Sequence, residues 1–468
     1  MISEHVIDAD GARLAATVVR AADPGPAVLL RTPYGRHQHL AEAFGWAKRG
    51  FTCVVVDVRG RYGSTGEFLP YAHERADGRV ALEWLRDNDF CDGRVIAVGA
   101  SYAAYCAVAT ALEGQLAGVI AAVPALGLGE TAREPGGAAR LACRLGWWSE
   151  HGGTSVARTT PLDHDLEALP IRDSLDVPGW STLWDAPPLS PLWTELSEVD
   201  TPLLAVGGLR DPFLRHTLRL ADTWRGPTTL VVGLWGHNLD TTQALGGKRI
   251  GALYTAWARA LHATPPTSTP TPNSWVGASS RFVGLMRDGC ALSRIKPTKR
   301  EFSADPLRPF PSRDVGVDLR CDADRTDRAL AVTDELGGGV LAGLVRVEID
   351  AVADAPDADW VFRLAVELPD GTWPQLGHAV ERRRHTPGEP TTVTAEIGPV
   401  GFEVPPNARL RLEIAGHHWP RHARNPHTGV DAVDATELLS SRREVRSCAV
   451  ELPWTTAEPV DVIKEVAR

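Results

Sequence analysis

The chain has 468 residues, of which 43% are hydrophobic and 23% charged. This composition is typical of a globular protein, and the length is enough for two or three domains. The net charge of −10 disfavours nucleic acid as a partner, and no stretch nears the roughly 18 consecutive apolar residues of a membrane span. Because the N-terminus also lacks a secretory signal, we expect a cytoplasmic protein without a membrane partner.

Seven cysteines are spread along the chain without close pairs, which predicts neither a disulfide framework nor a zinc site. Four histidines lie close together in sequence, at His417, His418, His422 and His427, but their spacing matches no defined metal motif. We therefore expect no metal site and no cofactor.

The first part of the chain alternates strands and helices. Alternating residues over 6–19 predict two antiparallel strands. Apolar, β-branched runs over 27–31 and 51–57 predict buried strands, with a helix over 40–49 between them. A strand, a helix and a strand at this spacing form a parallel crossover unit. A further helix is expected over 74–87.

A strand-to-helix turn around Ser101 is the central motif. The run Val95–Val98 predicts a buried strand, and the Ala-rich stretch Ala103–Leu112 predicts a buried helix. Ser101 lies between them, where a nucleophile elbow would present its hydroxyl above the sheet. Gly99 and Ala103 are small, as the close passage of strand and helix requires. The alternative is ordinary packing of a strand, a turn and a helix, so partners elsewhere in the chain must decide.

The alternation of strand and helix stops after the next strand, 119–123, and resumes later. Residues 125–202 contain five tryptophans among many Gly and Pro residues. An insertion of this length between core strands usually forms a cap. Strands over 203–207 and 228–234, each followed by a helix, then restore the pattern over 203–263.

A Pro-rich linker over 264–273 marks a domain boundary. Beyond it, short alternating runs separated by turn residues predict an all-β domain over 274–468, either a sandwich or a jelly roll. We therefore expect an α/β domain built from 1–124 and 203–263, a cap over 125–202, and this second domain.

Two residues after the elbow complete a candidate catalytic triad. Asp211 and His237 each follow a predicted strand, and ligands of open parallel sheets bind at the carboxyl ends of the strands. The order Ser101, Asp211 and His237 is the one expected of an α/β-hydrolase triad. Taken singly, Asp211 could cap the following helix and His237 could be a surface residue. The order and positions together favour the triad.

Several separate motifs make the resemblance to a family specific. In chain order they are Arg31–Gly35, Asp57–Gly60, Ser64–Phe68, Glu83–Leu85, Cys91–Gly93, Gly99–Tyr102, Val206–Gly208 with Asp211, Trp235–Asn238, Asp357–Gly371 and Ile414–Gly429. On these stretches the chain resembles the family of cocaine esterases and X-Pro dipeptidyl peptidases, which also holds α-amino-acid ester hydrolases. The resemblance implies an α/β-hydrolase domain with a short cap, followed by an all-β jelly-roll domain.

The resemblance also implies roles for individual residues. Ser101 matches the nucleophile, Asp211 the orienting acid and His237 the general base. Tyr34 matches the tyrosine whose hydroxyl, with the backbone N–H of Tyr102, forms the oxyanion hole. This agrees with the chemistry, because a serine hydroxyl needs a base to take its proton, and the base needs a carboxylate to hold its tautomer.

We therefore expect a serine hydrolase that cleaves a small-molecule carboxylic ester or amide through an acyl-enzyme. An acyltransferase using the same triad is one alternative, and a catalytically silent binding protein with this fold is another. The sequence leaves open whether the chain forms a homodimer.

Three residues are candidates for substrate contact. Trp147 and Trp148 lie in the expected cap, and because adjacent residues face different ways, one is expected to pack inward while the other meets ligand. Arg210 stands beside the acid and would favour an anionic group on the substrate. The alternatives are that both tryptophans pack the cap onto the core and that Arg210 faces solvent.

Overall fold

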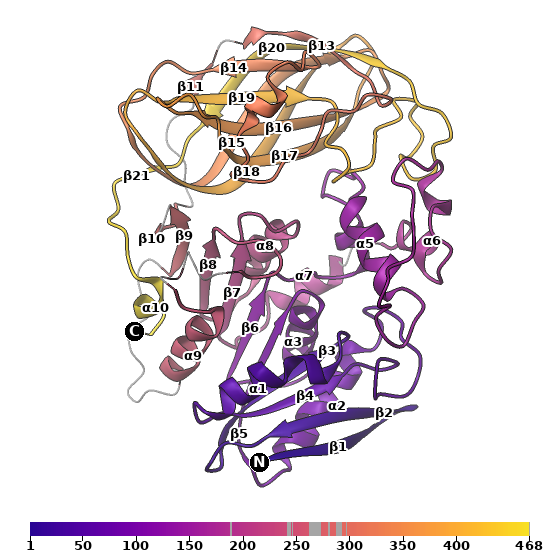
Figure 1. Ribbon diagram of the computed structural model, residues 1–468, viewed down its shortest axis with the longest axis vertical. Helices are drawn as coiled ribbons and strands as arrows, with labels where there is room; N and C mark the ends of the chain where they lie inside the picture. Colours follow the sequence, from indigo (N-terminus) through magenta and orange to yellow (C-terminus); the bar gives the residue numbers. More distant parts are fainter. Residues whose placement is uncertain are drawn as a thin grey trace.

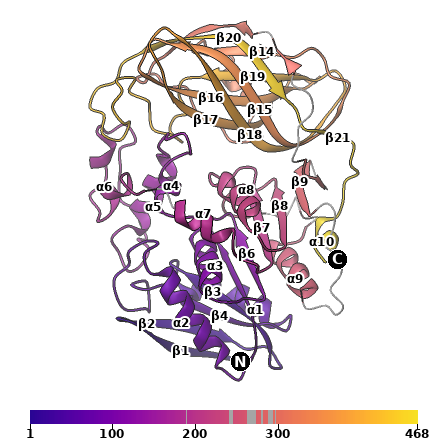
Figure 2. The ribbon, with the colours of Figure 1, turned by 180° about the vertical axis from the view of Figure 1, so that it is seen from behind.

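The computed structural model describes residues 1–187, 190–240, 245, 247–261, 273–278, 281–286, 293–295 and 297–467. They form an α/β domain and an all-β domain stacked one on the other, with the helices of the cap along one side of the junction (Figures 1 and 2). No helix in this described part is both long and apolar enough to cross a membrane.

The α/β domain is built on a ten-stranded sheet in the order β1-β2-β4-β3-β5-β6-β7-β8-β9-β10. The strands β1 and β2 pair antiparallel, whereas β4, β3 and β5 to β9 run parallel. Their bounds are β1 Ile2–Ala9, β2 Ala12–Val19, β3 Gly25–Thr32, β4 Thr52–Asp57, β5 Cys91–Ala100, β6 Gly118–Ala122, β7 Leu203–Gly208, β8 Thr228–Gly233, β9 Ser274–Ala278 and β10 Arg281–Gly284.

Helices cover both faces of this sheet, and the strands are apolar on both sides as a result. On β4, Val54 and Val56 belong to the core that includes residues of α2, α3 and α8, whereas Cys53 and Val55 belong to the core on the opposite face, which includes residues of α1 and α9. The helices are α1 Leu40–Ala47, α2 Glu74–Arg86, α3 Tyr102–Glu113, α8 Leu214–Thr223 and α9 Ile250–Ala260, with a short 3₁₀ helix η1 over Arg36–His39. The predicted α/β-hydrolase architecture is confirmed.

The limits of the α/β domain differ from those expected. The stretch 274–468 was expected to lie wholly in the β domain, but β9 and β10 extend the hydrolase sheet beyond β8. At the other end, α10 (Val462–Glu465) returns to pack beside α9. A short buried run such as β9 has the same pattern in a parallel sheet and in a sandwich, so only its pairing partner separates the two. The expected linker lies outside the described residues, except Asn273.

The cap region contains α4 (Leu128–Ala132), α5 (Ala142–His151), the 3₁₀ helix η2 (Ile171–Asp173), α6 (Trp180–Leu183) and α7 (Ser190–Leu196). Around Trp148 and Trp180, α5 and α6 form a small core of their own, which also takes in Ala423 and Val433 from the β domain. The cap therefore packs against the second domain. In contrast, α7 packs into the core of the α/β domain, so the expected cap over 125–202 ends before α7.

The second domain consists of two antiparallel sheets around a shared apolar core. The first contains β11 Ser293–Arg294, β13 Glu301–Ala304, β15 Gly339–Ala353, β18 Pro390–Val404, β20 Ser441–Glu451 and β21 Trp454–Thr455. The second contains β12 Pro297–Lys299, β14 Arg328–Val332, β16 Asp357–Glu367, β17 Gln375–Arg384 and β19 Arg409–Ala415. A 3₁₀ helix, η3 (Leu319–Asp322), precedes β14. The predicted all-β class is confirmed.

Candidate active site

The turn that holds Ser101 has a strained backbone. Strand β5 ends at Ala100 and α3 begins at Tyr102, so Ser101 alone makes the turn, with φ 58° and ψ −124°. A positive φ is costly for a residue with a side chain and is found mainly where the fold enforces it at a functional site. Gly99 permits the turn, because a Cβ on it would lie 2.0 Å from the carbonyl oxygen of Ala103. The strand and helix pass too closely for any larger residue.

Ser101, His237 and Asp211 form one hydrogen-bonded chain. The Ser101 Oγ lies 2.8 Å from His237 Nε2, and His237 Nδ1 lies 2.8 Å from Asp211 Oδ1. The same carboxylate oxygen accepts a hydrogen bond from the Phe213 N–H at 3.1 Å. Asp211 is buried, whereas the His237 side chain is 35% exposed. A buried carboxylate and an accessible imidazole are the arrangement that a general base needs.

Backbone contacts hold the loops of Asp211 and His237 together. Leu209 donates a hydrogen bond to the carbonyl of Gly233, and Arg210 donates one to the carbonyl of Trp235. Gly208 allows this approach, because a Cβ there would lie 2.4 Å from the carbonyl oxygen of Trp235. The Trp235 side chain is buried and anchors the loop that carries the histidine. The relative position of acid and base is thus set by the sheet edge.

Tyr34 and the backbone of Tyr102 point to the same place beside the serine. The Tyr34 hydroxyl oxygen lies 3.4 Å from Ser101 Oγ, and the Tyr102 N–H donates to that oxygen. Desolvation by burial raises the pKa of the Tyr34 phenol, so the hydroxyl keeps its proton at neutral pH. The Tyr34 hydroxyl and the Tyr102 N–H therefore lie together beside Ser101.

The structure separates the two adjacent tryptophans of the cap. The Trp147 Nε1–H donates to the Tyr34 hydroxyl at 3.4 Å, and its half-buried ring is parallel to that of Tyr102. Trp148 is 2% exposed and packs against Gly179 in the cap core, edge-on to Trp147. Trp147 therefore faces the serine site, and Trp148 supports it from behind.

Arg210 is exposed, and its Nε–H donates to the carbonyl of Val315 in the second domain at 3.0 Å. Within the ranges described, no contact joins its side chain to Ser101 or His237. The role expected for Arg210 in substrate binding stays a prediction.

Several side chains around the site were not identified from the sequence. Phe68 and Tyr71 are half-buried aromatic residues that pack on Tyr102, next to Trp147. Phe213 packs edge-on against the His237 ring at 5.4 Å. Together these rings give the site apolar walls. A loop of mixed Gly, Arg and aromatic residues, such as the one that carries Phe68, offers no periodic pattern that would reveal them.

On helix α5, the spacing of four residues in the sequence indicates that they share one face. Arg144, Trp147, Trp148 and His151 follow the i, i+3, i+4, i+7 spacing of one helical face. The His151 ring lies 5.2 Å from that of Tyr34, and burial lowers the pKa of His151 to about 4. The Arg61 guanidinium lies next to the His151 ring and is fully buried. It donates a hydrogen bond to the carbonyl of Pro33, which fixes the turn before Tyr34.

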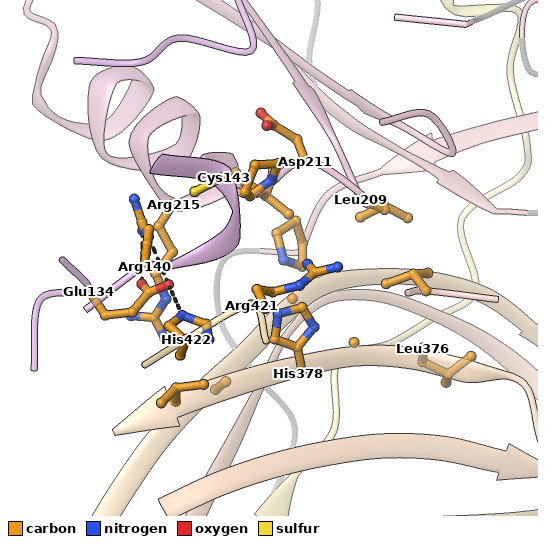
Figure 3. A pocket seen from close by; sticks show the side chains of 18 residues that line it. Glu134, Arg140, Cys143, Leu209, Asp211, Arg215, Leu376, His378, Arg421 and His422 are labelled. Carbon is orange, nitrogen blue, oxygen red and sulfur yellow. Dashed lines mark hydrogen bonds and ion pairs between the residues drawn. The ribbon is translucent and has the colours of Figure 1, made fainter. Parts of the chain in front are cut away.

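A separate small cavity of about 60 Å³ lies where the α/β domain, the cap and the β domain meet. Asp211 lines one side of it but points away from the other labelled side chains (Figure 3). Across the cavity, Glu134 of the cap pairs with Arg140 at 2.9 Å and with His422 of the β domain at 3.0 Å. Burial alone would raise the pKa of Glu134, but Arg140 and His422 hold it well below its ordinary value.

The clustered histidines are part of this junction and of the loop beside it. His422 Nδ1 lies 3.1 Å from His418 Nδ1, and the rings of His417 and His427 lie 5.3 Å apart. Among the residues that the structure describes, no group of three or more His, Cys, Asp and Glu side chains is arranged to hold a metal ion.

Comparisons with known proteins agree with this architecture. A sequence model of the X-Pro dipeptidyl-peptidase (S15) family matches residues 10–238, and one of the X-Pro dipeptidyl-peptidase C-terminal non-catalytic domain matches residues 246–455. Cocaine esterase from Rhodococcus sp. (strain MB1 Bresler) is 26% identical over an alignment of 523 positions, which covers 90% of this chain and 91% of that protein.

Solved structures share the fold at lower identity. An α-amino acid ester hydrolase superposes with a TM-score of 0.81 at 19% identity, covering 97% of this chain and 96% of the other. An aminopeptidase from the marine sediment archaeon Thaumarchaeota archaeon gives 0.80 at 18% identity, with the same coverage. A CocE/NonD family hydrolase from Staphylococcus aureus gives 0.69 at 13% identity, covering 97% of both chains. The chain belongs to the S15 family of X-Pro dipeptidyl peptidases and related esterases, and it is a serine hydrolase.

Proposed function

We propose that the chain cleaves a carboxylic ester or amide through an acyl-enzyme formed on Ser101. The observation that carries this proposal is the position of His237, which lies 2.8 Å from both Ser101 Oγ and Asp211 Oδ1. In this arrangement Nδ1–H donates to the carboxylate, so Nε2 is free to accept the serine proton.

The proton movements follow from this geometry. As Ser101 Oγ attacks the carbonyl carbon, His237 Nε2 takes the hydroxyl proton, and the buried Asp211 carboxylate stabilises the imidazolium that forms. When the tetrahedral intermediate collapses, the same nitrogen gives the proton to the leaving alcohol or amine. Water then repeats the sequence on the acyl-enzyme, releasing the acid and restoring the serine.

The Tyr34 hydroxyl and the Tyr102 N–H stabilise the negative charge on the oxygen of the tetrahedral intermediate by donating hydrogen bonds to it. The Tyr34 hydroxyl and the Tyr102 N–H meet beside Ser101 Oγ, and the phenol keeps its proton because burial raises its pKa. Donors that are already in place before charge develops stabilise the transition state more than the substrate. The Trp147 N–H, which donates to the Tyr34 hydroxyl oxygen, polarises that phenol further.

The aromatic walls favour a substrate with an apolar or aromatic group. Trp147, Phe68 and Tyr71 are each partly exposed and pack in one cluster with Tyr102, the residue after the serine. Rings of this kind bury a large area at little cost in rotamer entropy. Trp148 contributes by holding Trp147 in place.

Labelling with a fluorophosphonate probe tests the nucleophile, because the probe needs an activated serine but no knowledge of the substrate. The expected result is one label on the peptide that contains Ser101 and none in Ser101→Ala. Ser181→Ala, which removes an exposed hydroxyl from α6, is the matched control and should label as the wild type does. Unchanged labelling of Ser101→Ala would overturn the assignment.

Product analysis separates hydrolysis from transfer. With an activated ester in plain buffer, a hydrolase releases one acid for each alcohol. Release of the alcohol without the acid unless an amine or alcohol acceptor is added would instead mean that the acyl group is transferred.

A further inference from the structure

Arg144, on the cap helix α5, is a buried cation for which the described residues supply no hydrogen-bond acceptor. Its side chain is 5% exposed, and its Nε is fully buried with no hydrogen bond. Across the described ranges of the chain, no hydrogen bond and no ion pair joins the guanidinium to any other group. Burying a charge is costly, so buried arginines are normally paired.

One aromatic ring, that of Phe213, separates the guanidinium from His237. Its Cζ is 5.1 Å from the ring of Phe213, the residue that packs edge-on against His237. On α5 it stands one turn before Trp147, which donates to the Tyr34 hydroxyl. Its charge also acts on the phenols of Tyr34 and Tyr71. The cation is therefore placed between the neighbour of the general base and the oxyanion tyrosine.

Other buried arginines of this region show that the lack of a partner is specific to this position. Arg140, one turn earlier in the chain, is equally buried, but Glu134 accepts two hydrogen bonds from it at 3.0 and 2.9 Å. Arg61 donates to backbone carbonyls, among them that of Pro33 at 2.9 Å. Arg140 and Arg61 thus have acceptors, whereas the described residues supply none to the Arg144 guanidinium.

We propose that Arg144 binds a carboxylate carried by the substrate, and that this hydrolase prefers esters or amides with a free carboxylate in the acyl or alcohol part. The inference deepens the proposed function and rests on it. A guanidinium presents a planar fork that matches a carboxylate, and in a site screened from water the pair discriminates strongly against neutral analogues. The carboxylate-binding role expected for Arg210 stays a separate prediction, and Arg144 differs from Arg210 in being buried, whereas Arg210 is exposed and bonded to Val315.

The test uses pairs of esters that differ only in charge. Mono-4-nitrophenyl adipate and its methyl ester probe the acyl side, and 4-carboxyphenyl acetate and its methyl ester probe the alcohol side. In the wild type, kcat/KM is expected to favour the charged member of one pair. In Arg144→Met the ratio of charged to neutral should fall by about 10²-fold, and Arg144→Lys should keep part of the preference. Arg79→Ala, which removes an exposed arginine of α2 paired with Glu83, is the control.

Three outcomes would overturn the inference. A ratio that is unchanged in Arg144→Met for both pairs would do so. A loss of both members of a pair by the same factor, with a lower melting temperature, would show that Arg144 only packs against Phe213. A wild type that prefers the neutral member of both pairs would also exclude it.

A further measurement does not depend on the folding of the variant. Adipate should inhibit hydrolysis of a neutral ester by the wild type at least about 10-fold more strongly than adipamide, and equal inhibition would argue against the inference. Failure of the proposed function looks different, because the wild type would then neither take the fluorophosphonate label nor hydrolyse the neutral esters. A labelled, active enzyme without charge preference would remove only the role of Arg144.

Discussion

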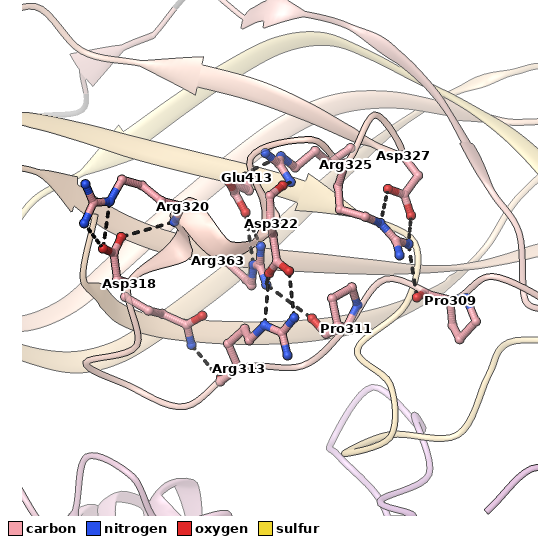
Figure 4. A network of polar contacts seen from close by, with 12 residues as sticks. Pro309, Pro311, Arg313, Asp318, Arg320, Asp322, Arg325, Asp327, Arg363 and Glu413 are labelled. Atoms are coloured by element: carbon pink, nitrogen blue, oxygen red, sulfur yellow. Dashed lines mark hydrogen bonds and ion pairs between the residues drawn. The ribbon is translucent and has the colours of Figure 1, made fainter. Parts of the chain in front are cut away.

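Two buried arginines, one in the β domain and one in the cap, have different surroundings. In the β domain, Arg363 is fully buried and bonded on all sides: to Glu413, to Asp322 at 3.0 Å and to the carbonyl of Pro311 at 3.2 Å (Figure 4). In the cap, Arg144 is also buried, but it has no such partner among the described residues.

The difference follows from the place of each buried cation in the fold. The network around Arg363 fastens the segment that leads to β14 onto the sheet, with Glu413, Asp322 and the Pro311 carbonyl as acceptors (Figure 4). The parallel sheet has an apolar interior, and its polar groups gather where the strands end, at Ser101, Asp211 and His237. Arg363 is therefore surrounded by acceptors, whereas the Arg144 guanidinium has no hydrogen-bond partner among the described residues.

The largest expected effect comes from the acid of the triad. Asp211→Asn keeps the size of the side chain but removes the charge that holds the His237 tautomer, so kcat should fall by about 10⁴-fold with little change in melting temperature. Asp200→Asn, at an exposed carboxylate paired with Arg225, should leave kcat unchanged. A fall in kcat of less than about tenfold in Asp211→Asn would remove the acid from the triad.

The next effect concerns stability and not chemistry. Arg363→Met leaves Glu413 and Asp322 buried without their shared cation, and should lower the free energy of unfolding by about 3–5 kcal/mol. Arg346→Met removes an exposed arginine of β15 and should cost about 1 kcal/mol or less. Denaturant unfolding measures both. Equal values for the two variants would mean that the buried network is not structural.

Removal of the proposed oxyanion donor, the Tyr34 hydroxyl, is expected to change kcat and not KM. Tyr34→Phe removes a hydroxyl that stabilises the transition state more than the bound substrate, so kcat should fall by about 10²–10³-fold while KM changes little. Tyr254→Phe, at a buried phenol of α9 on the far face of the sheet, is the control. If Tyr34→Phe instead lowers the melting temperature and keeps kcat, Tyr34 is a packing residue.

Acid should destabilise the β domain through its buried histidines. Desolvation by burial, with Arg443 nearby, lowers the pKa of His385 to about 4, and His427 is lowered to about 4 as well. The unfolded chain then binds more protons between about pH 6.5 and 4, so this stability is complete above pH 6.5 and is lost as the pH falls through that window.

At pH 5 the loss should reach about 1–2 kcal/mol for each such histidine. His385→Gln keeps an acceptor for the Trp360 N–H, which donates to His385 Nε2 at 3.0 Å, but does not titrate. Its melting temperature should therefore fall less between pH 7.5 and pH 5 than that of the wild type. An identical fall would exclude His385 as a source of acid sensitivity.

The smallest effect separates the two tryptophans of α5. Trp147→Ala should lower kcat/KM for an aryl ester about tenfold more than for a small aliphatic ester, because it removes a wall of the site. Trp148→Ala should lower the melting temperature and affect both esters alike, because Trp148 packs the cap core. The same selectivity in both variants would mean that α5 does not contact the substrate.

Local patterns in the sequence were enough to predict the α/β architecture and the order of the candidate triad. The buried runs that form β3 to β8 depend on residues next to one another, and the geometry of the elbow depends on Gly99, Ser101 and Ala103 alone. The end of a parallel strand is also a local property, so the residue pattern suffices to place Asp211 and His237 at the same sheet edge.

Only the tertiary structure shows with which elements the ambiguous segments pair and which groups surround the buried and exposed charges. The pairing of β9 with β8, the inward turn of Trp148, the bond from Arg210 to Val315 and the lack of a described partner for Arg144 all depend on groups far away in sequence. Periodicity shows that a residue is buried, but it does not show what lies opposite. The partner across a contact is set by packing. In this protein packing gives Arg363 a set of acceptors and leaves the Arg144 guanidinium without one among the described residues, which is the basis for the proposed carboxylate site.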